Sequence, residues 1–299
     1  MGHGRSISAT EAWRVVILTN SPGGLIYTLV DAVLRPLGHR VVGVLTSPGP
    51  LRRRCTGYLD VVAAMPPGVD VIVSNHPSRW GEMVAPLRPD LIICGEMPWR
   101  IPAEVLALPR LGVVYLHPAS LPSDRDPAAI DWVVRSEDPE VAFTVHHIVA
   151  DIASGPDPRQ TRPLFGDDGN DLLQATVGPV LPGLLGHAIA RVARDHRGEP
   201  QDGAGANCAD RPGDSWRTID WARPARMPHD QIRSWTGVPD VPDGGLGASN
   251  EGSLLDILTH PPHRDGPDGT ASAMPGDASR RDRGGLVVRC GDGSLGFVA

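Results

Sequence analysis

Residues 15–37 read VVILTNSPGGLIYTLVDAVLRPL, and this stretch decides the fold class of the chain. An uninterrupted apolar run at residues 15–18 is followed by a loop with one proline and two glycines, and then by an amphipathic segment at residues 25–37. Continuous runs of Val, Ile and Leu are typical of parallel strands buried on both faces, and an amphipathic period is typical of the helix after such a strand. The stretch therefore predicts a strand, a tight loop and a helix.

The same alternation continues through the first half of the chain. Further apolar runs lie at residues 41–45, 71–73, 91–94 and 113–116, another strand is expected at 142–148, and a long apolar period at 168–195 indicates a helix. We therefore predict an α/β domain with a Rossmann-like parallel sheet over residues 14–196. Its crossovers should be right-handed, and its ligand site should lie at the carboxyl ends of the strands.

The composition changes after residue 196. Residues 197–215 are rich in Gly, Asp, Pro and Ala, as expected for a linker. Residues 285–295 read GLVVRCGDGSL, which is a strand, a Gly-Asp-Gly turn and a second strand. This hairpin signal predicts a smaller β-rich domain over residues 216–299.

Charge and cysteine content narrow the function classes. The formal net charge is -7, and the chain contains no lysine, so all 28 basic residues are arginine. Because nucleic-acid binding gains affinity from clustered positive charge, we expect no strong nucleic-acid binding, although tRNA stays open as a partner. The four cysteines form no CxxC pair and have no histidine at metal spacing, so we expect free thiols and no metal site. No apolar stretch approaches the length of about 20 residues that a membrane helix needs, and the first residues lack an apolar signal core; we expect a cytoplasmic protein without a membrane partner.

Several short motifs occur in the middle of the chain in a fixed order. They are PDLI at 89–92, WRIP at 99–102, LGVVYLHP at 111–118, LP at 121–122, IDW at 130–132, TVH at 144–146 and SGP at 154–156. In this order and at these spacings the chain resembles the folate-dependent formyltransferases, which use 10-formyltetrahydrofolate and include enzymes that act on methionyl-tRNA and on sugar nucleotides. The likeness continues through IDW at 219–221, RSW at 233–235 and the closing hairpin, and it implies an OB-like second domain.

The resemblance also implies a catalytic site, in which two of three family residues are replaced. The family uses an asparagine to polarise the formyl oxygen, a histidine two residues later and an aspartate before a Thr-Gly turn. The histidine corresponds to His117, whereas Tyr115 stands at the asparagine position and Ala153 at the aspartate position. A tyrosine hydroxyl can donate to an oxyanion, so we predict Tyr115 as the donor. Asp151 shares a face with position 153 if the backbone is extended there, and is either a replacement acid-base group near His117 or an exposed loop carboxylate.

The family's folate-binding positions correspond to Trp99, Ile101, Pro102, Leu121 and Gly155. The resemblance therefore implies that these residues contact 10-formyltetrahydrofolate, although packing is the simpler role for Trp99. The replacement of a family glycine by an aspartate at position 126 alters the loop beside this site.

Three further features allow two interpretations each. The loop at residues 20–24 could bind an anion with its amides or be only a tight turn. His146 and His147 alternate across a strand, so at most one of them faces the site, and packing is the simpler role for each.

Two functions follow from these residues. The first is an enzyme that transfers a formyl group from 10-formyltetrahydrofolate to an amine, either methionyl-tRNA or a small amino compound. The second is a non-catalytic descendant of the family that binds a folate or another metabolite. A generic Rossmann-like nucleotide binder would need an acidic residue after its second strand, and residues 41–47 contain none.

Overall fold

The computed structural model describes residues 11–50, 57–118, 140–148, 160–163, 170–195, 219–235, 263–265, 274–280, 286–292 and 294–297. The chain divides into two compact units. Unit 1 comprises Met1–Asp124, Ala142–Thr161 and Thr176–Asn207, and unit 2 comprises Arg125–Val141, Arg162–Ala175 and Cys208–Ala299. The domain boundaries predicted from the sequence, 14–196, 197–215 and 216–299, stay a prediction.

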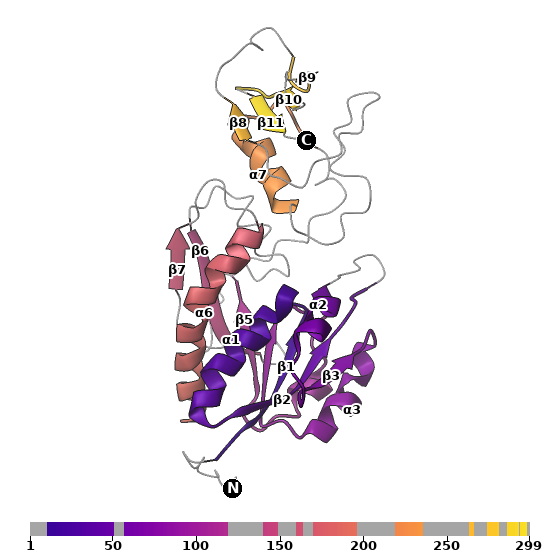
Figure 1. The fold of residues 1–299 in the computed structure, drawn as a ribbon, viewed down its shortest axis with the longest axis vertical. Helices are drawn as coiled ribbons and strands as arrows, with labels where there is room; N and C mark the ends of the chain where they lie inside the picture. Colours follow the sequence, from indigo (N-terminus) through magenta and orange to yellow (C-terminus); the bar gives the residue numbers. More distant parts are fainter. Residues whose placement is uncertain are drawn as a thin grey trace. The chain divides into compact units, whose positions relative to one another are not determined.

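A seven-stranded sheet in the order β3-β2-β1-β4-β5-β6-β7 forms the first part of the fold (Figure 1). Strands β1 to β5 pair in parallel, and β6 runs antiparallel to β5. The Rossmann-like parallel sheet predicted from the apolar runs is therefore confirmed. The strands are β1 (Arg14–Thr19), β2 (Arg40–Thr46), β3 (Asp70–Val73), β4 (Leu91–Gly95), β5 (Val113–His117), β6 (Glu140–Ile148) and β7 (Gln160–Pro163).

Helices lie between these strands, and one more, α6, follows the last strand. They are α1 (Leu25–Leu34), α2 (Gly57–Ala64), α3 (Trp80–Val84), α4 (Ala103–Leu106) and α6 (Asn170–Val192), with the short 3-10 helices η1 (Pro22–Gly24), η2 (Arg35–Leu37), η3 (Pro77–Arg79) and η4 (Ala85–Leu87). Helix α6 lies within the long apolar period at residues 168–195 and includes Pro179 and Pro182.

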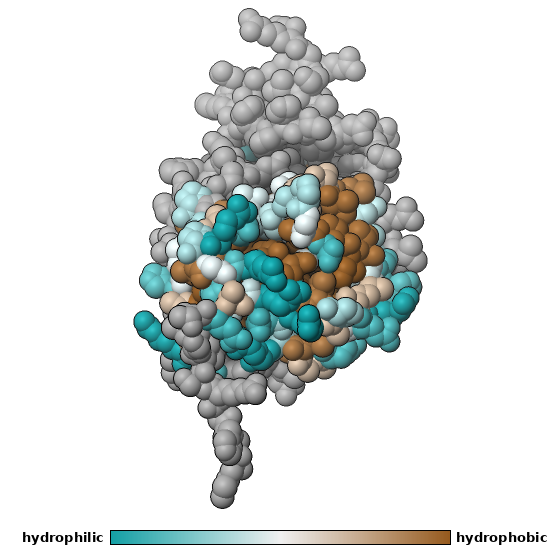
Figure 2. Space-filling view, turned by 60° about the horizontal axis from the view of Figure 1, so that its bottom comes forward, coloured by the Kyte–Doolittle hydropathy of each residue, from teal (hydrophilic) through white to brown (hydrophobic). Residues whose placement is uncertain are grey.

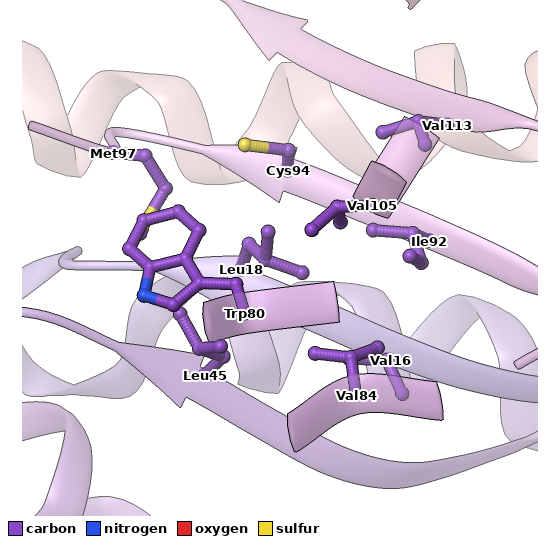
Figure 3. Close-up of a cluster of buried hydrophobic side chains, with 10 residues drawn as sticks. All are labelled: Val16, Leu18, Leu45, Trp80, Val84, Ile92, Cys94, Met97, Val105 and Val113. Carbon is purple, nitrogen blue, oxygen red and sulfur yellow. The ribbon is translucent and has the colours of Figure 1, made fainter. Parts of the chain in front are cut away.

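One face of the sheet carries an apolar cluster centred on Trp80, whose side chain is fully buried (Figure 3). The cluster joins residues of β1, β2, β4 and β5 to residues of α3 and α4: Val16, Leu18, Leu45, Trp80, Val84, Ile92, Cys94, Met97, Val105 and Val113. The opposite face is covered by α1, because a Cβ added at Gly95 would lie 3.6 Å from Ile26 Cδ1. Packing on both faces explains why the strands read as continuous apolar runs.

Unit 2 contains helix α7 (Arg226–Trp235) and an antiparallel four-stranded sheet in the order β8-β11-β10-β9. Its strands are β8 (His263–Asp265), β9 (Ala278–Arg280), β10 (Leu286–Arg289) and β11 (Ser294–Phe297). The predicted hairpin is confirmed, since β10 and β11 pair from Leu286↔Phe297 to Arg289↔Ser294. The OB-like arrangement implied by the resemblance stays a prediction.

The turn of this hairpin is bound to the segment before α7. Gly291 N donates to Arg223 O at 2.9 Å, and Ala225 N donates to an oxygen of Asp292. A Cβ added at Gly291 would collide with the carbonyl oxygen of Ala222, so only glycine allows this close approach.

The surface in Figure 2 mixes hydrophilic and hydrophobic areas. Large apolar side chains that are exposed in unit 1 include Leu37, Leu59, Val62 and Val73. Within the described ranges, no helix combines the length and the apolar character that crossing a membrane requires.

Candidate functional site

Three aromatic rings meet where β5 ends beside β6. Tyr115 and His117 lie two residues apart on β5, and their ring centroids are 5.6 Å apart. His146 on β6 is paired with Tyr115 in the antiparallel register, and its ring lies 5.7 Å from that of Tyr115 and 6.1 Å from that of His117. Both histidines are buried and Tyr115 is half-buried. The sheet therefore brings two predicted catalytic residues together and adds His146 to them.

The tautomer of His146 follows from its contact with the backbone. Its Nδ1 lies 3.0 Å from the carbonyl oxygen of His147. A carbonyl oxygen can only accept a hydrogen bond, so the neutral ring carries its proton on Nδ1 and presents Nε2 as an acceptor. His147 is paired with Val114 on β5, so it lies on the other face of the sheet.

A second group of polar residues lies at the carboxyl ends of β1 and β2. The Asn20 Oδ1 atom accepts hydrogen bonds from Ser47 N at 3.0 Å and from Thr46 Oγ1 at 2.8 Å, and Asn20 Nδ2 donates to Ser47 O. The Asn20 amide thus binds both backbone polar groups of Ser47. Since this side chain is buried and makes three hydrogen bonds within the fold, the structure gives Asn20 a structural role in this loop.

The Ser47 hydroxyl connects this group to Trp99. Trp99 Nε1 donates to Ser47 Oγ at 2.9 Å, Gly49 N donates to the same oxygen at 3.1 Å, and Ser47 Oγ lies 3.1 Å from Asn75 Oδ1, to which it donates. The loops that follow β2, β3 and β4 are therefore joined through one hydroxyl, and the loop that follows β1 is joined to them through the backbone of Ser47.

Trp99, Ile101 and Tyr115 are partly buried and pack against the apolar cluster around Trp80. Pro102 is half-buried and immediately precedes α4 with an extended backbone. The residues predicted for folate contact from the WRIP motif therefore follow β4, next to the strand that carries Tyr115.

The remaining predicted site residues, Asp151, Leu121 and Gly155, lie outside the described residues, as do Ala153 and Asp126. Their roles stay predictions. The sequence leaves His146 open between a packing role and a place in the site, and it gives no signal for Ser47. The position of His146 depends on the register of an antiparallel strand pair, and no local sequence pattern marks Ser47.

Cys94 is not suited to act as a nucleophile at this site. Cys94 lies on β4 opposite Tyr115, and full burial raises the pKa of its thiol far above the ordinary value. The thiol therefore stays protonated and is not a nucleophile. Cys94 and Cys290 are free thiols, and the described part of the chain contains no cluster of three or more His, Cys, Asp or Glu residues that could hold a metal ion.

The strand order and the position of these residues define the class of the protein. It is a Rossmann-like α/β protein whose polar and aromatic side chains gather at the carboxyl ends of β1, β2, β4 and β5, where ligands bind in this class.

Comparison with known proteins identifies the family. The chain is similar to the methionyl-tRNA formyltransferase of Pseudomonas paraeruginosa, with 32% identity over 216 residues, which cover 71% of this chain and 66% of that enzyme. It is 30% identical to the methionyl-tRNA formyltransferase of Pseudomonas entomophila over 226 residues, 75% of this chain and 69% of the enzyme. The chain belongs to the formyltransferase family. No protein-family model matches it.

A solved structure supports the fold. HypX from Aquifex aeolicus, crystallised in complex with tetrahydrofolic acid, superposes with a TM-score of 0.60 at 16% identity, covering 96% of this chain and 44% of HypX. At that identity the likeness shows the fold alone.

Proposed function

We propose that the protein transfers a formyl group from 10-formyltetrahydrofolate to an amine at the site formed by Tyr115, His117 and His146. The observation that carries the proposal is the contact of these three rings at the end of β5, beside the half-buried Trp99 and Ile101 that follow β4. The family membership and the tetrahydrofolate complex of HypX support a folate as the donor.

The residues present fit a folate. The flat indole of Trp99 and the aliphatic side chain of Ile101 suit the ring system of a pterin. Side chains that can donate and accept hydrogen bonds lie on the neighbouring strand β5. When bound, 10-formyltetrahydrofolate would supply the formyl group. Trp99, Ile101, Pro102, Leu121 and Gly155 would hold it.

The side chains of β5 and β6 would then divide the chemistry. The Tyr115 hydroxyl donates a hydrogen bond to the formyl oxygen, in place of the family's asparagine. Transfer would break the bond from the formyl carbon to the folate nitrogen and form one to the amine, so the proton that the amine loses would have to reach that nitrogen. His117 carries this proton, and the neighbouring His146 ring, whose centroid lies 6.1 Å from that of His117, offers Nε2 as an acceptor. Asp151 is the candidate carboxylate for the aspartate's role.

The alternative is a protein that binds a folate or another metabolite without turnover. It is favoured by the replacement of two family residues, Asn by Tyr115 and Asp by Ala153. Losing one oxyanion donor lowers rates by roughly a hundred- to a thousand-fold, and losing a positioned base by about a hundred- to ten-thousand-fold. The alternative therefore predicts tight binding without product.

A binding titration followed by a transfer assay separates the two. We expect 5-formyltetrahydrofolate, a stable analogue, to bind, and formylated product to form from 10-formyltetrahydrofolate with one of a panel of amines that includes methionyl-tRNA. Tyr115→Phe, which keeps the ring packing, should lower kcat by about a hundred- to a thousand-fold. The matched control Tyr58→Phe removes a hydroxyl on α2 and should leave kcat unchanged. Binding of the folate without product from any amine would select the alternative. No folate binding would refute the transferase and would leave only a binder of another metabolite.

The charge of the chain bears on the choice of the amine acceptor. The relatives act on methionyl-tRNA according to their names, whereas the net charge of -7 gives weak long-range attraction to phosphates. We propose a small amine or methionyl-tRNA that is bound without strong salt dependence. A gel-shift titration with tRNA at two salt concentrations checks this, and tight salt-sensitive binding would contradict it.

The family's own residues provide a further test of the site. Tyr115→Asn combined with Ala153→Asp should raise the rate of formyl transfer if the replacements are what limits it. Unchanged transfer in the double variant, with folate binding intact, would show that the reaction centre lies elsewhere.

A further inference from the structure

We infer that Ser47 is a positioning residue that sets the orientation of the Trp99 indole at the folate site, and thereby the affinity for the folate ring. The positioning itself stands on hydrogen bonds in the structure, whereas its effect on the ligand rests on the proposed function.

The Ser47 hydroxyl is saturated by the contacts it makes. It accepts from Trp99 Nε1 at 2.9 Å and from Gly49 N at 3.1 Å, and it donates to Asn75 Oδ1 at 3.1 Å. A hydroxyl has one proton and two lone pairs, so these three bonds use its full capacity. Its oxygen has no capacity left for a ligand, which makes the role of Ser47 one of support.

Ser47 is itself held rigidly. It is fully buried, and the Asn20 side chain binds its backbone N–H and its carbonyl group. Because Asn20 follows β1 and Ser47 follows β2, the oxygen that receives the indole is fixed relative to two central strands of the sheet. A fixed acceptor transmits its position to the side chain that donates to it.

Trp99 needs such an anchor because it is only partly buried. One part of its indole packs against the apolar cluster, and apolar packing is non-directional. The indole has a single N–H donor, and Ser47 Oγ receives it. This one directional contact, made across 52 residues of sequence, selects the ring plane that the site presents.

The orientation of the indole plane affects the binding of a ligand that stacks on it more than the binding of a ligand held by hydrogen bonds. Aromatic rings attract in offset-stacked or edge-to-face arrangements, so a rotated indole loses contact with a flat pterin. The bond should therefore act on folate affinity and leave the amine and the chemical step unaffected.

The test compares Ser47→Ala with a matched control. Ser74→Ala removes another buried hydroxyl at the same edge of the sheet. This hydroxyl accepts a hydrogen bond from His76 N at 3.2 Å, and that bond does not involve Trp99. Ser47→Thr keeps the hydroxyl and serves as the conservative rescue. All variants are made in the full chain, and the indole resonance of Trp99 is assigned with Trp99→Phe.

In Ser47→Ala without ligand, we expect the Trp99 indole proton to move upfield and to exchange faster with solvent. The Kd for 5-formyltetrahydrofolate and the KM for 10-formyltetrahydrofolate should each rise by about two- to ten-fold, the size of one lost neutral hydrogen bond. The KM for the amine and kcat should change less than two-fold, and Ser74→Ala should match wild type in all these values.

The two parts of the inference fail separately. An indole resonance that is identical in Ser47→Ala and wild type overturns the positioning, whatever binds. A shifted resonance with unchanged folate affinity overturns the link to the ligand while leaving the proposed function intact. Absence of folate binding in wild type refutes the proposed function, and the indole resonance still decides the positioning.

Discussion

Substituting Gly24 by alanine should destabilise the loop that follows β1. The structure indicates two separate costs, one from the backbone conformation and one from a steric contact. Gly24 has φ of 66° and ψ of 22°, in the left-handed region, and a Cβ added there would lie 2.6 Å from Ala64 Cβ at the end of α2. The neighbouring Gly23 has a similar φ of 62°, but an added Cβ would meet nothing within 4 Å. The two glycines therefore share the backbone cost and differ in the steric one.

The expected magnitudes follow from this difference. Gly23→Ala should lower the free energy of unfolding by about 1–2 kcal/mol, the cost of a left-handed alanine. Gly24→Ala should lose the same amount and about 1–3 kcal/mol more, because a Cβ contact of 2.6 Å forces η1 and α2 apart. With a urea m-value of about 2 kcal/mol/M, the midpoints of the two variants should differ by roughly 0.5–1.5 M.

A double-mutant cycle isolates the steric part. Ala64→Gly removes the atom that Gly24→Ala would strike, so the double variant should recover about 1–3 kcal/mol relative to additivity. Urea unfolding followed by tryptophan fluorescence gives each value. Equal losses for Gly23→Ala and Gly24→Ala, with a coupling energy below about 0.5 kcal/mol, would refute the packing of η1 against α2.

Two further predictions concern stability. Burial lowers the pKa of His39 below its usual 6.5. Its Nδ1 accepts a hydrogen bond from Trp13 N at 3.2 Å, and the two rings stack. Because His39 binds a proton more readily in the unfolded chain, its contribution to stability is present above pH 6.5 and is lost as the pH falls through the lowered pKa. The urea midpoint should therefore drop more between pH 7.5 and pH 5.5 for wild type than for His39→Phe, and an equal drop in both proteins would contradict this. Gly291→Ala should cost about 1–3 kcal/mol in unit 2, because the new methyl group strikes the Ala222 carbonyl; hydrogen exchange of the amides of β10 and β11 measures it, and unchanged protection would argue against the observed packing of the hairpin turn.

Strands β1, β2, β4 and β5 could be predicted because each is largely buried, whereas β3 is an edge strand with an exposed Val73 and is marked by its apolar run alone. The apolar runs at residues 15–18, 41–45, 71–73, 91–94 and 113–116 lie within β1, β2, β3, β4 and β5. A strand between two helical layers has few polar positions, so its sequence marks both its presence and its burial. The hairpin at residues 285–295 was predictable for a different reason, since its turn residues restrict the backbone locally.

The partners of His146 and Ser47 could not be predicted in the same way. The position of His146 opposite Tyr115 depends on the register of β6 against β5, and a shift of one residue would place His147 there instead. The bond from Trp99 to Ser47 joins residues that lie 52 positions apart and follow different strands. Neither contact leaves a period or a spacing in the sequence, because each is set by how whole strands pair.

These two contacts bear on how a family site can change its residues and keep its fold. The strands beneath the site are fixed by the apolar cluster around Trp80, and none of its members is Tyr115, His117 or His146. A tyrosine at position 115 extends farther from the strand than an asparagine would, and it gains a ring contact with His146 from the neighbouring strand. The larger side chain therefore contacts the rings of His117 on β5 and His146 on β6. The residue at position 115 can therefore differ from the family's asparagine while the apolar cluster and the strand order of the sheet stay those of the class.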